Sequence, residues 1–399
     1  GIDPYAHWIA RARKKGISPW ISSRMNDLHE VNDDRCYMHS EFWREHPEFR
    51  RVPYRQDGWD KRALDFGRVE VRERHMKLIR ELAERYDFDG LELDWMRFGY
   101  HFRPGHEAEG GELLTQFMRD VRALLRSWEK KRGHRIQLGA RVPSRPWTAV
   151  NLGMDGVRWA REGLVDMLVP TPFWATMEFD IPIEEWKRLL RGLPVTLAAG
   201  LEVLIRPYPN YRRVYVQNSI ETVRGAASAM LDRGADRIYL FNYMSSDTTQ
   251  QDTENYHSML CEIGTLATMA GKPRRHILTY SDTWAPGEPE FRNGLPAECK
   301  PGDWRAFRLP TGPKPGAGNA RIVFGISDAD AQSIAGWEVR LNGTQATFVG
   351  DPKLRFSIPE CPLFAFEIPV AGVNRGYNTI EVKAASSGTI HWVEMNIQG

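Results

Sequence analysis

Two acidic residues alternate with leucines in one short segment of the chain. In Gly90-Leu91-Glu92-Leu93-Asp94, a β-strand period of two places Glu92 and Asp94 on one face and the leucines on the other. Burying carboxylates among apolar residues costs free energy unless they are used or neutralised. We therefore expect a functional site at this strand end. The alternative is structural: Asp94 caps the next turn or pairs with Arg97.

A third acid, Glu202, follows another predicted strand, from Val195 to Gly200. Two carboxyl groups that flank a glycosidic bond can hydrolyse it, one as proton donor and the other as nucleophile or base. We predict that Asp94 and Glu202 form such a catalytic pair, with carboxyls about 5 to 10 Å apart across an open cleft. Glu178 and Asp180 are alternative partners.

Further polar and aromatic residues follow the same predicted strands and are candidates for binding sugar. Glu92 is expected to orient Asp94 or an arginine, or to raise the pKa of Asp94 by repulsion between like charges. Arginine, amide and phenol groups hold hydroxyl or acidic groups, and indoles stack on the apolar face of a sugar. The candidates are Arg24, Asn26, Arg97, Arg141, Asn242, Tyr243, Trp95 and Trp174. The alternatives are that Arg97 and Arg141 neutralise buried acids and that Tyr243 belongs to the core.

The elements around these residues alternate between strands and helices. Helices are predicted at 4–15, 69–86, 112–131, 154–162, 182–191, 218–232 and 254–269, and strands at 17–23, within 87–98 after a turn at Asp89-Gly90, and at 136–142, 165–169, 195–200 and 237–243. Six strand-then-helix units predict a parallel sheet with right-handed crossovers. The long connection 26–65 is expected to form a wall of the cleft.

We interpret the sheet as part of a (β/α)8 TIM barrel, which needs eight strands. The sequence opens on a helix, so we expect the first two strands to lie upstream of Gly1, which makes Asp94 the end of the fourth strand and Glu202 that of the seventh. Six strands alone would leave a parallel sheet open at its edge. We predict that an upstream segment, a second chain or a homo-oligomer fills this gap.

The pattern of the sequence changes near residue 276, from alternating strands and helices to short strands alone. Short alternating segments are predicted as strands at 320–326, 337–341, 345–349, 354–358, 364–368, 378–383 and 389–397. Asn342-Gly343 signals a hairpin turn. We therefore predict a barrel domain at residues 1–275 and an accessory β-sandwich at 276–399, which packs on the barrel or binds sugar.

Composition narrows the classes of partner. The 54 basic and 52 acidic residues are interspersed and give a net charge of +2, which argues against nucleic acid or a membrane surface as partner. No apolar run is long enough to span a bilayer. The four cysteines lack the spacing of metal ligands. His101, His106 and Glu107 lie close together in sequence, but no spacing pattern identifies them as metal ligands. We therefore predict no metal or cofactor. The sequence leaves the cellular compartment undetermined and favours an extracellular or periplasmic location.

The segment from Phe66 to Arg97 resembles the family-10-like glycosyl hydrolase group. Its members are (β/α)8 proteins. Their fourth strand reads approximately Tyr-Asp-x-Asp-Gly-x-x-x-Asp, followed by an aromatic residue and often an arginine. The corresponding segment of this chain is Tyr86-Asp87-Phe88-Asp89-Gly90-Leu91-Glu92-Leu93-Asp94-Trp95-Met96-Arg97. Residues 224–227 and 234–242 resemble that group's last helix and strand, so the resemblance covers roughly residues 1–272. It implies that Asp94 is the acidic strand end and Arg97 its basic follower.

A weaker resemblance is to the chitinase-type strand Asp-Gly-x-Asp-x-Asp-x-Glu. Asp89, Glu92 and Asp94 fall in its register, but Met96 stands where its catalytic glutamate would be. This difference argues against an N-acetyl-assisted mechanism and increases the weight on Glu202. The expected function is hydrolysis of a poly- or oligosaccharide; the alternative is a non-catalytic carbohydrate-binding protein on a degenerate barrel.

Overall fold

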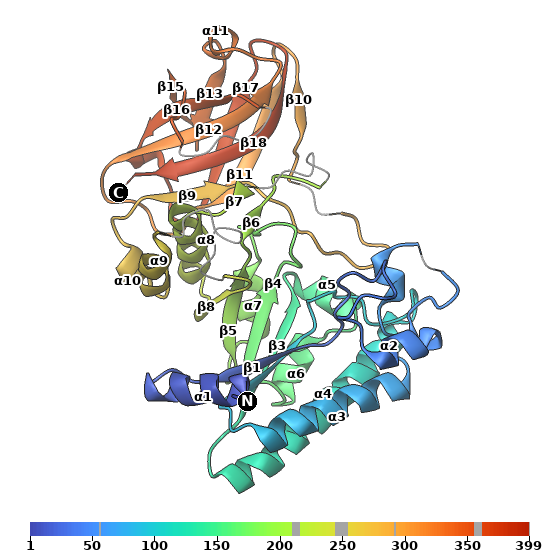
Figure 1. The fold of residues 1–399 in the computed structure, drawn as a ribbon. Coiled ribbons are helices and arrows are strands. Elements are labelled where there is room, and N and C mark those ends of the chain that lie inside the picture. Colours follow the sequence, from blue (N-terminus) through green and yellow to red (C-terminus); the bar gives the residue numbers. More distant parts are fainter. Residues whose placement is uncertain (56, 210–215, 244–253, 291–292, 355–360, 399) are drawn as a thin grey trace. The chain divides into compact units, whose positions relative to one another are not determined.

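A computed structural model describes residues 1–55, 57–209, 216–243, 254–290, 293–354 and 361–398 (Figure 1). The chain forms two compact units, each built from segments that are separate in sequence. Unit 1 contains Gly1–Phe173, Glu185–Ala198 and Thr283–Glu288. Unit 2 contains Trp174–Glu184, Ala199–Asp282 and Pro289–Gly399.

The six predicted strands form one sheet in the order β1-β2-β3-β4-β5-β8. They are β1 (Trp20–Arg24), β2 (Gly90–Asp94), β3 (Gln137–Pro143), β4 (Met167–Thr171), β5 (Thr196–Leu201) and β8 (Arg237–Leu240). The pairings from β1 to β5 are parallel. The protein is therefore a mixed α/β protein with a six-stranded sheet, and closure to eight strands stays a prediction.

The helices between the strands follow the predicted pattern. They are α1 (Pro4–Lys14), α3 (Val69–Arg85), α4 (Glu107–Arg132), α6 (Gly156–Arg161), α7 (Ile183–Leu189) and α8 (Ile220–Asp232). Local signals set their ends: Asp3 accepts the first free N–H groups of α1, Ser219 and Thr222 form a capping box on α8, and Gly133 ends α4 in the left-handed region. Among the described residues, no helix is long and apolar enough to cross a membrane.

Some elements differ from the prediction. The helix expected at 254–269 is two helices, α9 (Tyr256–Glu262) and α10 (Leu266–Met269), because Thr265 caps a new start. The connection 26–65 contains α2 (Glu41–Glu45) and the 3₁₀ turns η1 (Pro47–Phe49) and η2 (Trp59–Arg62). The sequence did not indicate α5 (Pro146–Asn151) or the hairpin of β6 (Leu204–Ile205) and β7 (Val216–Gln217).

The C-terminal strands form two antiparallel sheets within unit 2, around a shared apolar core. One contains β9 (Arg274–Ile277), β10 (Ala297–Cys299), β12 (Asn319–Ser327), β15 (Thr347–Gly350), β16 (Leu363–Pro369) and β18 (Gly388–Ile397). The other contains β11 (Trp304–Pro310), β13 (Glu338–Leu341), β14 (Thr344–Gln345) and β17 (Tyr377–Lys383). The short helix α11 (Ala331–Ile334) and the turn η3 (Val370–Gly372) join strands.

The hairpin predicted at Asn342-Gly343 is confirmed, since both residues have positive φ. The sequence missed β10 and β11, and the strand predicted at 354–358 lies largely outside the described residues. The predicted domain boundary at 275/276 falls within β9. In unit 2, β9 contacts α8 so closely that a Cβ on Gly225 would lie 1.8 Å from the Arg275 carbonyl oxygen, which only glycine permits.

Two histidines are buried in the core of unit 1, where the ring of Phe66 contacts both. Burial disfavours the charged imidazolium and lowers the pKa of His75 to about 4 and that of His101 to about 3. His101 also makes a 2.8 Å hydrogen bond through Nε2 to the Trp95 carbonyl oxygen. This bond fixes the orientation of the His101 ring in the core.

We predict that these histidines make the free energy of unfolding fall below neutral pH. The unfolded chain takes up protons near pH 6.5 and the folded core does not, so their contribution is complete above about pH 6.5 and is lost as pH falls toward 4, at about 1.4 kcal/mol per histidine and pH unit. Urea unfolding at pH 7 and pH 5 measures it. His101→Gln should reduce the pH dependence, and exposed His7→Gln should not; equal slopes in both variants would contradict the prediction.

The outer strand β1 is exposed at one side of the sheet. Among the described residues it pairs with β2 alone, and α1, which precedes it, buries none of its side chains. Trp8 and Ile17 are 64% and 57% exposed. Parallel sheets are normally covered on both faces and at their edges.

We therefore predict that this chain self-associates at micromolar concentration through the open side of β1. Size-exclusion chromatography with light scattering measures the mass against concentration. Trp8→Glu combined with Ile17→Glu should shift the protein toward monomer, because it places charge on the apolar surface. A well-folded monomer at every concentration in the unsubstituted chain would refute the association and the prediction that something fills the gap in the barrel.

Candidate active site

Strand β2 delivers Glu92 and Asp94 in the predicted register, and both are buried together with Leu91 and Leu93. Ser22 lies opposite Glu92 on β1, and its hydroxyl donates a 2.7 Å hydrogen bond to Oε1 of Glu92. Both acids therefore lie in the carboxyl-terminal half of a parallel strand, and barrel enzymes have their active sites at the carboxyl-terminal ends of such strands.

Asp94 is the centre of a buried ion pair. Its Oδ2 lies 2.6 Å from Nη1 of Arg141, the residue opposite it on β3, and both side chains have 0% exposure. Oδ1 accepts the backbone N–H groups of Met96 and Arg97 at 3.1 and 2.9 Å. The Arg141 guanidinium neutralises Asp94 inside the protein, as the structural alternative expected, and contact of Arg141 with substrate stays a prediction. Asp94 caps the next turn, as one structural alternative expected, but its ion-pair partner is Arg141 and not Arg97.

The loop after β1 brings a histidine to Arg97. Nη2 of Arg97 donates a 2.5 Å hydrogen bond to Nε2 of His29, so the proton of a neutral imidazole is on Nδ1, which faces Asp27. Asp27 also pairs with the exposed Arg24 at 2.9 Å. Sequence reasoning missed His29, whose one signal was its place in the polar run after β1. Binding of substrate by Arg24 and Arg97 stays a prediction.

The side chain of Asn26 is hydrogen-bonded to the backbone of two other segments. It is buried, its Oδ1 accepts the Leu64 N–H at 3.0 Å, and its Nδ2 donates to the carbonyl oxygens of Leu64 and Tyr100. Because these partners are backbone groups far apart in sequence, Asn26 fastens the long connection 26–65 to the sheet. Contact of Asn26 with substrate stays a prediction.

Trp95 is a core residue, and its role in stacking on sugar stays a prediction. The indole is 0% exposed, and its ring packs against Phe66, His101 and Phe117. The indole of Trp59 does belong to a partly exposed aromatic group, with its centroid 5.4 Å from the ring of Phe98 and from the ring of Phe173. Phe98 has φ 63°, a strained conformation of the kind found at functional sites.

Glu202 follows β5 directly and is buried in unit 2. Two side chains hold its backbone carbonyl oxygen: the Tyr243 hydroxyl donates at 2.9 Å and Asn218 Nδ2 at 2.8 Å. Burial first, and then the negative charge of Glu202, raise the pKa of Tyr243, so its phenol stays a donor. Tyr243 therefore positions the backbone of Glu202, and contact of Tyr243 with sugar stays a prediction.

Asn218 is a residue that sequence reasoning missed. It precedes the Ser219 cap of α8, so its only signal was a polar residue at a helix start. Its Oδ1 is buried and has no hydrogen-bond partner among the residues that the structure describes. This buried acceptor lies on one of the two residues that hold the backbone of Glu202.

Glu178, also buried in unit 2, lies on a segment that hydrogen-bonds to the chain after Glu202. The Met177 N–H donates to the Leu204 carbonyl oxygen at 2.6 Å, and the Thr176 hydroxyl accepts the Arg206 N–H at 2.9 Å. The structure thus brings the backbones that carry Glu178 and Glu202 together. Asp180, the other alternative acid, accepts the Tyr377 hydroxyl at 2.6 Å and pairs with Arg233 at 3.0 Å, so it is structural.

Trp174 and Asn242 complete the predicted set, and both belong to unit 2. Trp174 is 39% exposed, and the Arg206 guanidinium lies 5.4 Å from its ring centroid. Its N–H and that of Ala175 donate to Asp282, which fixes the loop. Asn242 follows β8 with φ 60°. Sugar binding by either residue stays a prediction, as does the pairing of Asp94 in unit 1 with Glu202 in unit 2.

Comparisons with known proteins do not identify the family. No protein-family model matches the sequence, and no curated protein matches it. Among solved structures, the chain is similar to the glycoside hydrolase domain of PelA from Pseudomonas aeruginosa (14% identity, TM-score 0.34, 58% of this chain and 81% of that one). The resemblance to the family-10-like group stays a prediction.

Two longer proteins are similar over more of this chain. They are a cycloisomaltooligosaccharide glucanotransferase from Paenibacillus sp. (11% identity, TM-score 0.33, 98% of this chain) and a β-porphyranase of glycoside hydrolase family 86 from Bacteroides plebeius (10% identity, TM-score 0.26, 87% of this chain and 83% of that one). The chain spans about half, 47%, of the glucanotransferase. At such identities and TM-scores, these similarities establish neither family nor reaction.

The Asp94–Arg141 pair generates a prediction about stability. Arg141→Met leaves the Asp94 carboxylate buried without its counter-charge and should lower the free energy of unfolding by about 3–5 kcal/mol. Asp94→Asn combined with Arg141→Met should cost less than Arg141→Met alone, because no uncompensated charge remains. Urea denaturation of both variants, with Asp94→Asn as the second single variant, completes the double-mutant cycle. Additive losses would refute coupling between the two side chains.

Proposed function

We propose that the protein is a glycoside hydrolase that cleaves a poly- or oligosaccharide, with Glu202 as one of its two catalytic carboxyls. The observation that carries the proposal is the placement of Glu202: a buried carboxylate directly after a parallel strand, on a backbone held by Tyr243 and Asn218. Catalysis at a glycosidic bond requires carboxyls held firmly in position at a strand end.

Glu178 is our first candidate for the second carboxyl. It is buried in the same unit, and hydrogen bonds link its segment to the segment that follows Glu202. Asp94 is the alternative that the strand pattern predicts. In either arrangement one carboxyl protonates the leaving oxygen, and the other attacks the anomeric carbon or activates water.

A non-catalytic carbohydrate-binding protein is the second candidate. The specific observation that favours it is the full burial of Asp94 in its ion pair with Arg141, since this carboxylate is already neutralised. Trp174 would then bind sugar by stacking without turnover.

Hydrolysis of a panel of aryl glycosides and polysaccharides by the whole chain tests the proposal. Glu202→Gln should lower kcat by roughly 10²–10⁴-fold with little change in KM, because it removes a proton-transfer or nucleophilic group and keeps the side-chain shape. Glu178→Gln and Asp94→Asn identify the second carboxyl by the same loss.

Glu185→Gln is the matched control, because Glu185 lies at the surface and pairs with the neighbouring Arg188 at 3.0 Å. Thermal unfolding shows whether each variant still folds. Full activity in Glu202→Gln would refute the assignment of that residue. Sugar binding without turnover by the unsubstituted protein would refute the hydrolase and favour the binding protein.

A further inference from the structure

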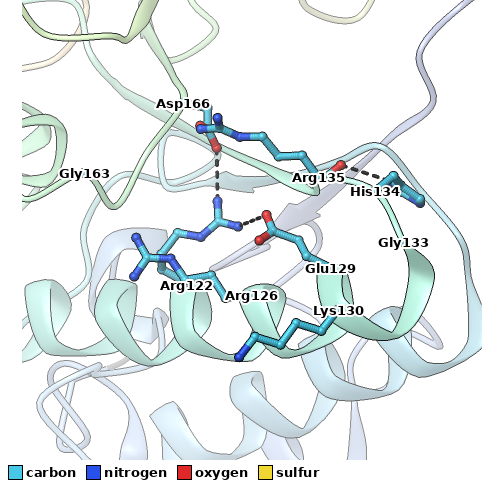
Figure 2. Close-up of a pocket in the computed structure, with 9 residues that line it drawn as sticks. All are labelled: Arg122, Arg126, Glu129, Lys130, Gly133, His134, Arg135, Gly163 and Asp166. Carbon is cyan, nitrogen blue, oxygen red and sulfur yellow. Dashed lines mark hydrogen bonds and ion pairs between the residues drawn. The ribbon is translucent and has the colours of Figure 1, made fainter.

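Unit 1 contains a pocket of about 630 Å³ at the amino-terminal ends of β3 and β4 (Figure 2). Its walls are the second half of α4, the segment that leads from α4 into β3, and the residues just before β4. Asp94 and Glu92 end β2 at the other, carboxyl-terminal end of these parallel strands. None of the residues that we assign to hydrolysis lines the pocket.

The lining carries an excess of positive charge. Arg122, Arg126, Lys130 and Arg135 face two acids, Glu129 and Asp166, so four positive and two negative charges leave a formal charge of +2. His134 also lines the pocket, and its hydrogen bond to Asp87 raises its pKa. Protonation of His134 would add to this excess of positive charge.

Both acids are already engaged by their neighbours. Asp166 accepts Arg122 at 3.0 Å, the Leu138 N–H at 2.8 Å, and Arg135. Glu129 accepts Arg122 at 2.6 Å and the Ile136 N–H at 3.1 Å. These contacts, drawn in part in Figure 2, explain Arg122 and Arg135 as a structural network at the strand starts.

Arg126 and Lys130 are not explained by this network. Neither has an ion pair or hydrogen bond within the described part of the chain. With Arg122 they occupy positions i, i+4 and i+8 of α4, where like charges repel. Burial lowers the pKa of Arg122; the charges of Glu129 and Asp166 oppose this shift, and those of Arg126 and Arg135 add to it.

The helix dipole accounts for only part of the excess. Cations in the last turn complement the free carbonyl groups of a helix, and Lys130 lies in the last turn of α4. Arg126 lies a full turn earlier, where the dipole no longer acts. An anion in the pocket would neutralise Arg126 and Lys130 together.

We propose that this pocket binds a multiply charged oxoanion, a phosphate or sulfate group, between Arg126 and Lys130 of α4 and Arg135. Guanidinium groups bind such anions with two parallel hydrogen bonds, and an ammonium group adds a point charge. The group is either free in solution or carried on a polymer. The proposal is independent of the proposed hydrolase.

Calorimetric titration of the whole chain with inorganic pyrophosphate and with dextran sulfate tests the site, with uncharged dextran as blank. Arg126→Ala and Lys130→Ala should each weaken binding about fivefold, and the affinity should fall as salt rises. The probe that binds more tightly shows whether the anion is free in solution, like pyrophosphate, or carried on a polymer, like the groups of dextran sulfate. Both residues are exposed, so the variants should fold, and thermal unfolding checks this.

Lys131→Ala is the matched control, because Lys131 lies on the same helix next to Lys130, but its ammonium group contacts the ring of Trp128, 4.0 Å from the centroid. It should leave binding unchanged. Failure of both probes to bind would overturn the proposal, as would an equal loss in Lys131→Ala or unchanged affinity in the Arg126→Ala and Lys130→Ala variants.

Discussion

The buried ion pair between Asp94 and Arg141 is the constraint on which the carboxyl end of the sheet in unit 1 depends. Two charges with no exposed surface are tolerated only when each neutralises the other and the remaining hydrogen-bonding capacity is used. The backbone N–H groups of Met96 and Arg97 occupy the other oxygen of Asp94. One carboxylate therefore sets the register of β2 against β3 and the path of the chain that follows.

That path positions the polar and aromatic residues around it. The turn that Asp94 caps carries Arg97 to His29 and Phe98 to Trp59. Asn26 fastens the long connection 26–65 to the same region through three backbone hydrogen bonds. These residues position the loops around the ion pair, and Glu202, the carboxyl that we propose first for catalysis, lies outside it.

The two ends of the parallel strands use charge in different ways. At the amino-terminal end, Asp166 joins α4 to β3 through Arg122 and the Leu138 N–H, and cations exceed acids around it. After β5, the charge of Glu202 is buried beside Tyr243 and Asn218, which bind its backbone. The first arrangement attracts an anion, whereas the second holds a carboxylate in a fixed place. Both follow from the cost of burying charge without a partner.

The sequence by itself determined the elements: the alternation of strands and helices, the six strands of the parallel sheet, the hairpin at Asn342-Gly343 and the acids Glu92 and Asp94 on one buried strand. These follow from local periodicity and turn chemistry, which act over a few residues. Only the tertiary structure decided what each side chain contacts. Arg141, Asn26, Trp95 and Tyr243 had residue types suited to binding sugar, and in the structure their neighbours across the sheet or from distant loops engage them. A polar group in the interior takes whichever partner the fold brings within hydrogen-bonding distance, and that partner is not encoded nearby in the sequence.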